Sequence, residues 1–80
     1  MTGIDDWSGK TALIVGGSGG MGRATAQEFA DAGANVAIAD INTENLPSQY
    51  LAIKSDITKV SDCADMVSKT VQRFGRLDLL

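Results

Sequence analysis

Five of the nine glycines in this sequence fall between residues 16 and 22, in the run Gly-Gly-Ser-Gly-Gly-Met-Gly. The run follows an apolar segment, residues 11–15, and opens an alanine-rich segment at Gly20. Glycine tolerates positive φ in a tight turn and has no side chain to hold the backbone away from a bound group. Backbone N–H groups at the start of a helix attract anions, phosphate above all. The pattern predicts a phosphate-binding turn between a strand and a helix.

Two registers of the glycine pattern fit a phosphate-binding turn. Gly17, Gly19 and Gly22 match G-x-G-x-x-G, whereas Gly16, Gly20 and Gly22 match a longer G-x-x-x-G-x-G. We favour the second register because it starts directly after the apolar segment, where a strand should end. The alternative is a merely flexible loop, and the flanking strand and helix patterns argue against it.

Asp40 ends a second apolar run and lies eighteen positions after Gly22. An acid about twenty residues past such a turn accepts hydrogen bonds from the two hydroxyls of an adenosine ribose. Its charge also repels a 2′-phosphate, and residues 41–49 contain no Lys or Arg to offset that repulsion. We therefore predict that NAD is favoured over NADP and that Asp40→Ala removes the preference. Taken alone, an Asp at a strand end is more often a turn or cap residue.

The hydrophobic pattern predicts the elements that must hold these residues. Two short apolar runs without polar alternation, residues 11–15 and 35–39, indicate strands buried on both faces of a parallel sheet, and a third run follows at residues 50–54. The predicted order is strand 11–15, helix 20–32, strand 35–39, strand 50–54, helix 60–74 and a fourth strand at 77–80. This alternation is typical of an α/β fold with a parallel sheet. The short link 41–49 contains Pro47, so any crossover helix there must be vestigial.

The second helix has the clearest amphipathic pattern in the chain. Thr58 is the predicted N-cap and Gly75 the predicted residue just past the C-terminus. Six apolar residues at helical spacing form the predicted core face. These are Val60, Cys63, Ala64, Val67, Val71 and Phe74.

Composition excludes several classes of site. The 80 residues contain no His and one Cys, so there is no His-containing triad, no thiolate cluster and no internal disulfide. We expect no metal site. The net charge is −3, whereas nucleic-acid-binding domains are typically basic, so we expect no binding to nucleic acid. No signal peptide or bilayer-length apolar run is visible, so we expect a cytoplasmic protein that does not bind membranes.

The sequence resembles the short-chain dehydrogenase/reductase family. The resemblance rests on motifs in the right order from about Trp7 to Leu80. The motifs are the segment 9–15, the glycine turn 16–22, Asp40, Asp56-Ile57-Thr58 and Phe74-Gly75-Arg76-Leu77-Asp78. It implies an incomplete Rossmann-type parallel sheet of about four strands, in the order β-α-β-β-α-β. Residues 1–80 would be the N-terminal part of an NAD-binding domain whose catalytic part is absent.

The same resemblance implies roles for single residues. Asp40 would bind the adenosine ribose, and Ile41 would lie beside the adenine. The Asp56 carboxylate would meet the adenine amino group, with the Ile57 backbone alongside. The alternative interpretation is that Asp56 only caps the following helix. The residues expected around the pyrophosphate and adjoining ribose are Gly16, Ser18, Gly20, Met21 and Gly22.

The implied activity is hydride transfer between a nicotinamide cofactor and a small alcohol or ketone, in a homo-oligomer. Val15 replaces the family's usual Thr before the first glycine. The family's Asn-Asn-Ala-Gly segment, catalytic Ser and Tyr-x-x-x-Lys pair would follow the fourth strand. No catalytic residue is therefore predicted here, and the chain alone should be inactive. Tyr50 and Lys54 match Tyr-x-x-x-Lys literally, but they lie in a predicted strand.

Two other functions are compatible with the glycine turn and Asp40. One is a non-catalytic nucleotide-binding fragment or minimal Rossmann module. The other is a methyltransferase-like fold with an adenosyl sulfonium cofactor, against which the Asp56-Ile57-Thr58 and Phe74–Asp78 motifs count. We also expect self-association or poor folding of the isolated chain, because Leu77–Leu80 would form a bare apolar sheet edge.

Overall fold

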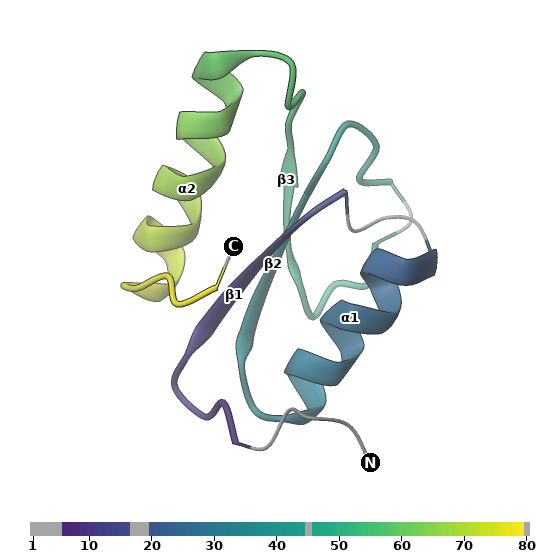
Figure 1. The fold of residues 1–80 in the computed structure, drawn as a ribbon, viewed down its shortest axis with the longest axis vertical. Coiled ribbons are helices and arrows are strands. Elements are labelled where there is room, and N and C mark those ends of the chain that lie inside the picture. The colour runs from purple at the N-terminus through teal and green to yellow at the C-terminus, as the bar shows by residue number, and fades with distance from the viewer. Residues whose placement is uncertain (1–5, 17–19, 45, 80) are drawn as a thin grey trace.

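The computed structural model describes residues 6–16, 20–44 and 46–79. Figure 1 shows a small sheet with one helix on each side. The elements in chain order are β1 (Thr11–Val15), α1 (Gly20–Asp31), β2 (Asn35–Asp40), β3 (Leu51–Lys54) and α2 (Val60–Phe74). The predicted alternation of strands and helices is confirmed.

The sheet has the order β1-β2-β3, and both strand pairs are parallel. Val15 at the end of β1 is in register with Ala39, and Asp40 at the end of β2 is in register with Lys54. The carboxyl ends of all three strands therefore meet at one edge of the sheet. In open α/β sheets this is the edge at which ligands bind.

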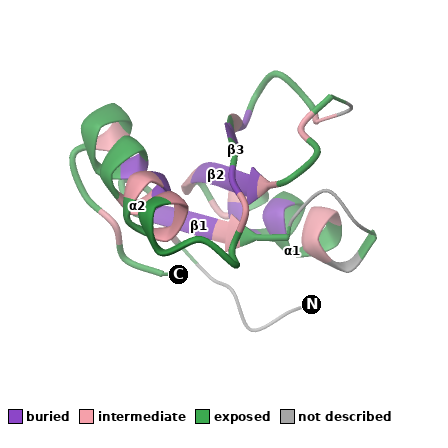
Figure 2. Ribbon diagram, turned by 90° about the horizontal axis from the view of Figure 1, so that it is seen from above, coloured by how far each residue is buried: buried purple, intermediate pink, exposed green. Residues whose placement is uncertain are grey.

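Each face of the sheet is covered by one helix (Figures 1 and 2). Successive side chains of a strand point to opposite faces, so neighbours in sequence belong to different cores. Ala12 packs with Phe29 of α1, whereas the adjacent Leu13 packs with Met66 of α2. All strand residues at the centre of β2 are buried, which explains its unbroken apolar sequence.

The link between β2 and β3 contains no helix among its described residues. Tight turns replace a crossover helix, as the short length and Pro47 predicted. One consequence is that Ala52 and Lys54 of β3 are exposed. Their side chains share the α1 face with the buried Tyr50, since alternate strand residues point the same way.

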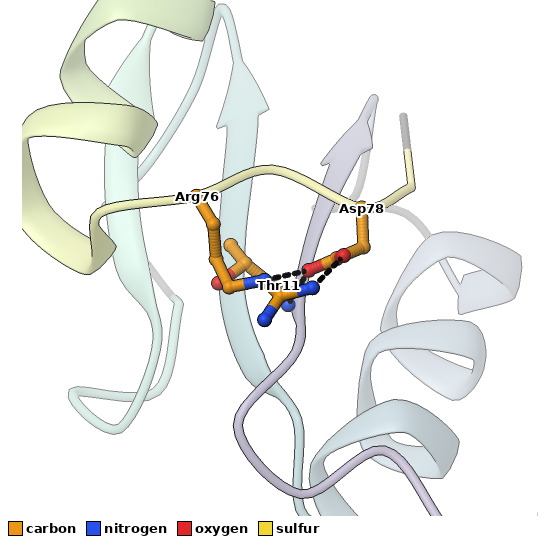
Figure 3. Close-up of polar contacts among 3 residues, drawn as sticks. All are labelled: Thr11, Arg76 and Asp78. Carbon is orange, nitrogen blue, oxygen red and sulfur yellow. Dashed lines mark hydrogen bonds and ion pairs between the residues drawn. The ribbon is translucent and has the colours of Figure 1, made fainter.

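The predicted fourth strand at 77–80 is reduced in the described residues to a single parallel bridge between Ala12 and Leu79. Asp78 fastens this segment to β1 (Figure 3). Its Oδ2 accepts hydrogen bonds from the Thr11 backbone N–H at 2.9 Å and from Arg76 Nε at 2.8 Å. The Asp78 N–H in turn donates to the Thr11 carbonyl at 2.9 Å.

Helix α2 differs from its prediction at the start and in the face it buries. The N-cap is Lys59, without a side-chain hydrogen bond, so the prediction of Thr58 is wrong. Met66 and Thr70 are buried, whereas Val60 is 87% exposed. The sheet therefore packs against one side of the predicted core face of α2 and not against its centre. The C-terminus is as predicted: Gly75 has φ of +82°, and its N–H donates to the Val71 carbonyl.

Candidate functional site

Gly16 turns the chain at the carboxyl end of β1. Its φ is +75°, a conformation that glycine adopts without steric cost. Its N–H donates to the carbonyl of Ala39 at 2.7 Å, so the first residue of the turn is attached to β2. Asp40 is the next residue of β2. The two separate sequence signals, the glycine turn and the acid, are therefore brought to the same place.

Gly20 is the first residue of α1, where backbone N–H groups have no partner within the helix. A Cβ built at Gly16 or at Gly20 would meet no atom within 4 Å. The space in front of both positions is open, as close approach of a pyrophosphate requires. Gly22 lies in the first turn of α1. Ser18 and the side chain of Met21 lie outside what the structure describes.

Asp40 is half-buried and is fixed by the chain on both sides. Its Oδ1 accepts a hydrogen bond from the Asn42 N–H at 3.1 Å. Its backbone carbonyl accepts one from the Ser55 N–H at 2.9 Å, which ties the end of β2 to the end of β3. The carboxylate is therefore oriented at the sheet edge, and a carboxylate group can accept several hydrogen bonds at once.

A pocket of about 360 Å³ lies between the carboxyl ends of β2 and β3 and the start of α2. Two predicted adenine-site residues, Ile41 and Asp56, line it. Ile41 is 65% exposed, so an apolar side chain is available to a flat aromatic ring. Ile57 is also exposed but is not among the lining residues. The other residues around the pocket are Lys54, Ser55, Lys59 and Asp62.

Asp56 shapes the turn that leads into α2. Its Oδ1 accepts hydrogen bonds from the Thr58 hydroxyl at 2.6 Å and from the Thr58 N–H at 2.9 Å. These bonds, the hydroxyl first, hold the pKa of the Asp56 carboxyl below its ordinary value. The Asp56 N–H donates to Asp62 Oδ2 at 2.9 Å. Asp56 thus stays ionised at neutral pH and is suited to accept a hydrogen bond from an amine, while it also organises its own turn.

Four pocket residues were not predicted from the sequence: Lys54, Ser55, Lys59 and Asp62. Lys54 is the most consequential, because the register of β2 and β3 places it beside Asp40. Residues 41–49, the segment next to Asp40 in the chain, contain no Lys or Arg, and Lys54 lies beyond them. The signal that could have found Lys54 is its place at the end of the next strand.

Tyr50 does not form a catalytic pair with Lys54. It precedes β3, at the opposite end of the strand from the glycine turn, and is buried against α1. Its hydroxyl donates to Gln27 Oε1 at 3.3 Å. The structure supports a packing role for Tyr50, as its predicted place in a strand implied.

A larger hollow of about 410 Å³ runs along β3 and the C-terminal half of α2. It holds none of the predicted site residues and lies away from the glycine turn, so we place the site at the smaller pocket. Within the described ranges, no group of three or more His, Cys, Asp or Glu side chains could hold a metal ion. None of the helices described is long and apolar enough to cross a membrane.

The family model for short chain dehydrogenases matches residues 10–80, which is nearly the whole chain. The chain belongs to the short-chain dehydrogenase/reductase family. This membership excludes the methyltransferase-like alternative and confirms the resemblance that the motifs indicated.

Two relatives show what this chain is similar to. A short chain dehydrogenase/reductase of Gibberella zeae, dpfgG, is 40% identical over 88 residues, covering 99% of this chain and 33% of the relative. The 2,5-dichloro-2,5-cyclohexadiene-1,4-diol dehydrogenase of Sphingobium indicum is 39% identical, covering 94% of this chain and 33% of its own length. The chain therefore spans about a third of these relatives.

Solved structures of dehydrogenases and reductases are also similar to this chain. The 3-ketoacyl-(acyl-carrier-protein) reductase of Brucella melitensis, complexed with NADH, superposes with a TM-score of 0.82 at 33% identity, covering 92% of this chain and 34% of that one. Glucose dehydrogenase of Caenorhabditis elegans superposes with a TM-score of 0.83 at 32% identity, covering 91% of this chain and 37% of that one. The three-stranded sheet and two helices are thus the start of the short-chain dehydrogenase fold.

Proposed function

We propose that this chain binds the adenosine and pyrophosphate half of NAD in an NAD-dependent short-chain dehydrogenase/reductase. The observation that carries the proposal is the junction of Gly16 and Asp40, joined through the 2.7 Å hydrogen bond from Gly16 to Ala39. This junction puts the start of α1, the glycine turn and the Asp40 carboxylate at one edge of the sheet, which supports the proposal. Residues 1–80 are accordingly assigned to the N-terminal part of an NAD-binding domain.

The proposed binding roles follow from the chemistry of each group. Gly16, Gly20 and Gly22 admit the pyrophosphate to the positive end of α1. Asp40 accepts hydrogen bonds from the ribose hydroxyls, and Ile41 covers one face of the adenine. Asp56 accepts a hydrogen bond from the adenine amino group, with the Ile57 backbone nearby. Ser18 and Met21 complete the proposed set next to the pyrophosphate and ribose.

The preference for NAD rests on the charge of Asp40. A carboxylate beside the ribose repels a 2′-phosphate, and like charges about 4 Å apart interact by up to about 4 kcal/mol near a protein surface before salt screening. A tenfold difference in affinity corresponds to about 1.4 kcal/mol. We therefore propose that NAD binds at least roughly tenfold more tightly than NADP.

The complete enzyme is proposed to transfer a hydride between the nicotinamide and the carbon of a small alcohol or ketone. The cofactor supplies the hydride chemistry when bound, and the protein supplies binding and orientation. The relatives that act on a diol and a ketoacyl group support a hydroxyl or carbonyl substrate. This chain contributes no proposed proton-transfer group, because Tyr50 is buried at the far end of β3.

Isothermal titration calorimetry of the 80-residue chain with NAD and with NADP tests the proposal. Tighter binding of NAD is expected, with a loss of that preference in Asp40→Ala. Equal affinity of the wild-type chain for both dinucleotides would contradict the role of Asp40. A second assay follows NADH formation from a panel of alcohols, and the chain alone should form none.

A further inference from the structure

We propose that Lys54 is a second determinant of the choice between NAD and NADP, acting against Asp40. The inference rests on the proposed function, since it concerns the same adenosine site. Asp40 favours two free ribose hydroxyls, whereas Lys54 attracts a phosphate dianion at the 2′ position. The preference for NAD is then the difference between two opposed charges on neighbouring strands.

The register of the sheet places these two charges together. Asp40 and Lys54 are Cα partners in the parallel pair of β2 and β3, and each is the last residue of its strand. Neighbouring strands lie about 4.8 Å apart, and residues in register point to the same face. Both side chains therefore leave the sheet on the α1 face, at the edge that carries the glycine turn.

Lys54 is available to a ligand. Lys54 is exposed and is one of the residues around the 360 Å³ pocket, with Ile41 and Asp56, and it also borders the larger hollow along β3 and α2. Its ammonium group forms no ion pair with any residue that the structure describes. The reason for this exposure is the short link 41–49, whose described residues place no helix over the α1 face of β3.

The charges around the pocket point to Lys54 rather than to the second lysine. Lys59 also lines the pocket, but it lies at the N-cap of α2 and has no register partner at the end of β2. Asp56 and Asp62 lie beside it on the same turn and helix, and Asp62 accepts the Asp56 N–H. An ammonium group binds phosphate as a point charge, so proximity to the 2′ position decides which lysine contributes.

This arrangement changes what loss of Asp40 should do. If Asp40 were the one charge that matters, neutralising it would make NAD and NADP bind equally. With Lys54 beside it, neutralising Asp40 leaves an unopposed cation next to the 2′ position. The preference should then reverse in favour of NADP, and the reversal should require Lys54.

A double-mutant cycle of Asp40→Asn and Lys54→Met tests this inference. Both substitutions are close to isosteric, and methionine keeps most of the apolar stem of lysine. Affinities for NAD and NADP are measured by calorimetry for the wild-type chain, both single variants and the double variant. Circular dichroism of each variant checks that the fold is intact.

The cycle has a defined expected result. Lys54→Met should widen the preference for NAD by about tenfold, mainly by weakening NADP. Asp40→Asn should bind NADP several-fold more tightly than NAD, and the double variant should bind both equally. Lys54→Arg should retain the wild-type ratio, and Lys59→Met should change it less than twofold. Raising the salt concentration should shrink the effect of Lys54→Met, because the attraction is screened.

The outcomes separate this inference from the proposed function. One contradicting result has three parts: the wild-type chain prefers NAD, Asp40→Asn binds NAD and NADP equally, and Lys54→Met leaves the ratio of the two affinities unchanged. In that case Lys54 has no role in the choice of cofactor, and the proposed function stands. If Lys59→Met produces the effect expected of Lys54→Met, the inference is also overturned. If the wild-type chain binds neither dinucleotide, the proposed function fails and takes the inference with it.

Discussion

Gly16 donates its backbone N–H to the carbonyl of Ala39 at 2.7 Å, so the glycine turn is attached to the strand that ends in Asp40. This single bond links two features that lie more than twenty residues apart in the chain. Because β1 and β2 are paired strands of one sheet, the sheet sets the geometry between the proposed pyrophosphate and ribose sites. Substitutions at the turn should therefore affect binding more than folding.

Gly20→Val should weaken dinucleotide binding by tenfold or more while leaving the free energy of unfolding within about 1 kcal/mol of wild type. The reason is that Gly20 has open space in front of it, so the chain accommodates a side chain but the pyrophosphate does not. Calorimetry with NAD and urea unfolding measure the two quantities. Wild-type affinity in Gly20→Val would show that no ligand approaches this position.

Gly75→Ala is the matched control for the glycine substitution. Its φ of +82° strains any other residue, and forcing alanine into this conformation costs about 1–2 kcal/mol. Gly75 follows α2 and is remote from the turn. The folded fraction of this variant should bind NAD as the wild-type chain does, although its unfolding midpoint is lower.

The stability of the chain should fall in acid partly because of Asp78. Its hydrogen bond from the Arg76 side chain, and next the bond from the Thr11 N–H, lower the pKa of the Asp78 carboxyl below its ordinary value of 3.8. The unfolded chain therefore takes up this proton at a higher pH than the folded chain. The stabilisation is present above about pH 4 and is lost as the pH falls through the folded pKa.

Asp78→Asn should lower the unfolding midpoint at pH 7 and should approach the wild-type midpoint below pH 4. Thermal unfolding between pH 2.5 and 7 measures this. Some acid dependence remains in the variant, since the pKa values of Asp6 and Asp56 are lowered too. Asp65→Asn, which breaks an exposed pair with Lys69, is the control and should change stability by about 0.5 kcal/mol or less. If the unfolding midpoints of Asp78→Asn and wild type differed by the same amount at all pH values, the account would be contradicted.

The sequence predicted most of the fold because each element carries a local signal. Buried strands need unbroken apolar runs, and the glycine at the end of α2 adopts the left-handed conformation that its place suggested. The buried face of α2 was predicted less well. Periodicity finds an apolar arc, but the direction from which the sheet packs decides that Met66 is buried and Val60 is exposed.

The candidate site was predictable where function depends on one chain segment, as at Gly16 and Asp40. It was not predictable where the site depends on strand register. Lys54 lies fourteen positions after Asp40 in the sequence and beside it in the sheet. Asp56 was predicted from its motif, and its bonds to Thr58 form a local turn in place of the helix cap that was the alternative interpretation.

Ser55→Ala should raise the free energy of unfolding by about 1 kcal/mol. The Ser55 hydroxyl is buried and has no hydrogen-bond partner in the described part of the chain, and a buried unpaired polar group costs about 1–3 kcal/mol. Thr70→Val is the contrast, because the Thr70 hydroxyl donates to the Met66 carbonyl at 2.7 Å. That variant should be no more stable than wild type. A less stable Ser55→Ala chain in urea unfolding would show that the hydroxyl is paired after all.

The isolated chain should self-associate through exposed apolar side chains beside β1 and on α2. Leu79 beside β1 and Val71 on α2 are 37% and 41% exposed, and Val60 is far more so. Bare sheet edges and exposed apolar patches bind other chains. Sedimentation velocity should show a concentration-dependent increase in mass, reduced in Val60→Ser/Val71→Ser. A monomer at all concentrations would contradict this prediction.

Mapping of NAD binding onto backbone amide signals by NMR tests the central claim most directly. Addition of NAD to the 80-residue chain should shift the amides of Gly16, Gly20, Ile41 and Ile57, which surround the carboxyl ends of the strands. The amide of Gly33 at the opposite end of the sheet should stay unchanged. Shifts confined to the hollow along β3 and α2, or no shifts at all, would contradict a dinucleotide site at the glycine turn.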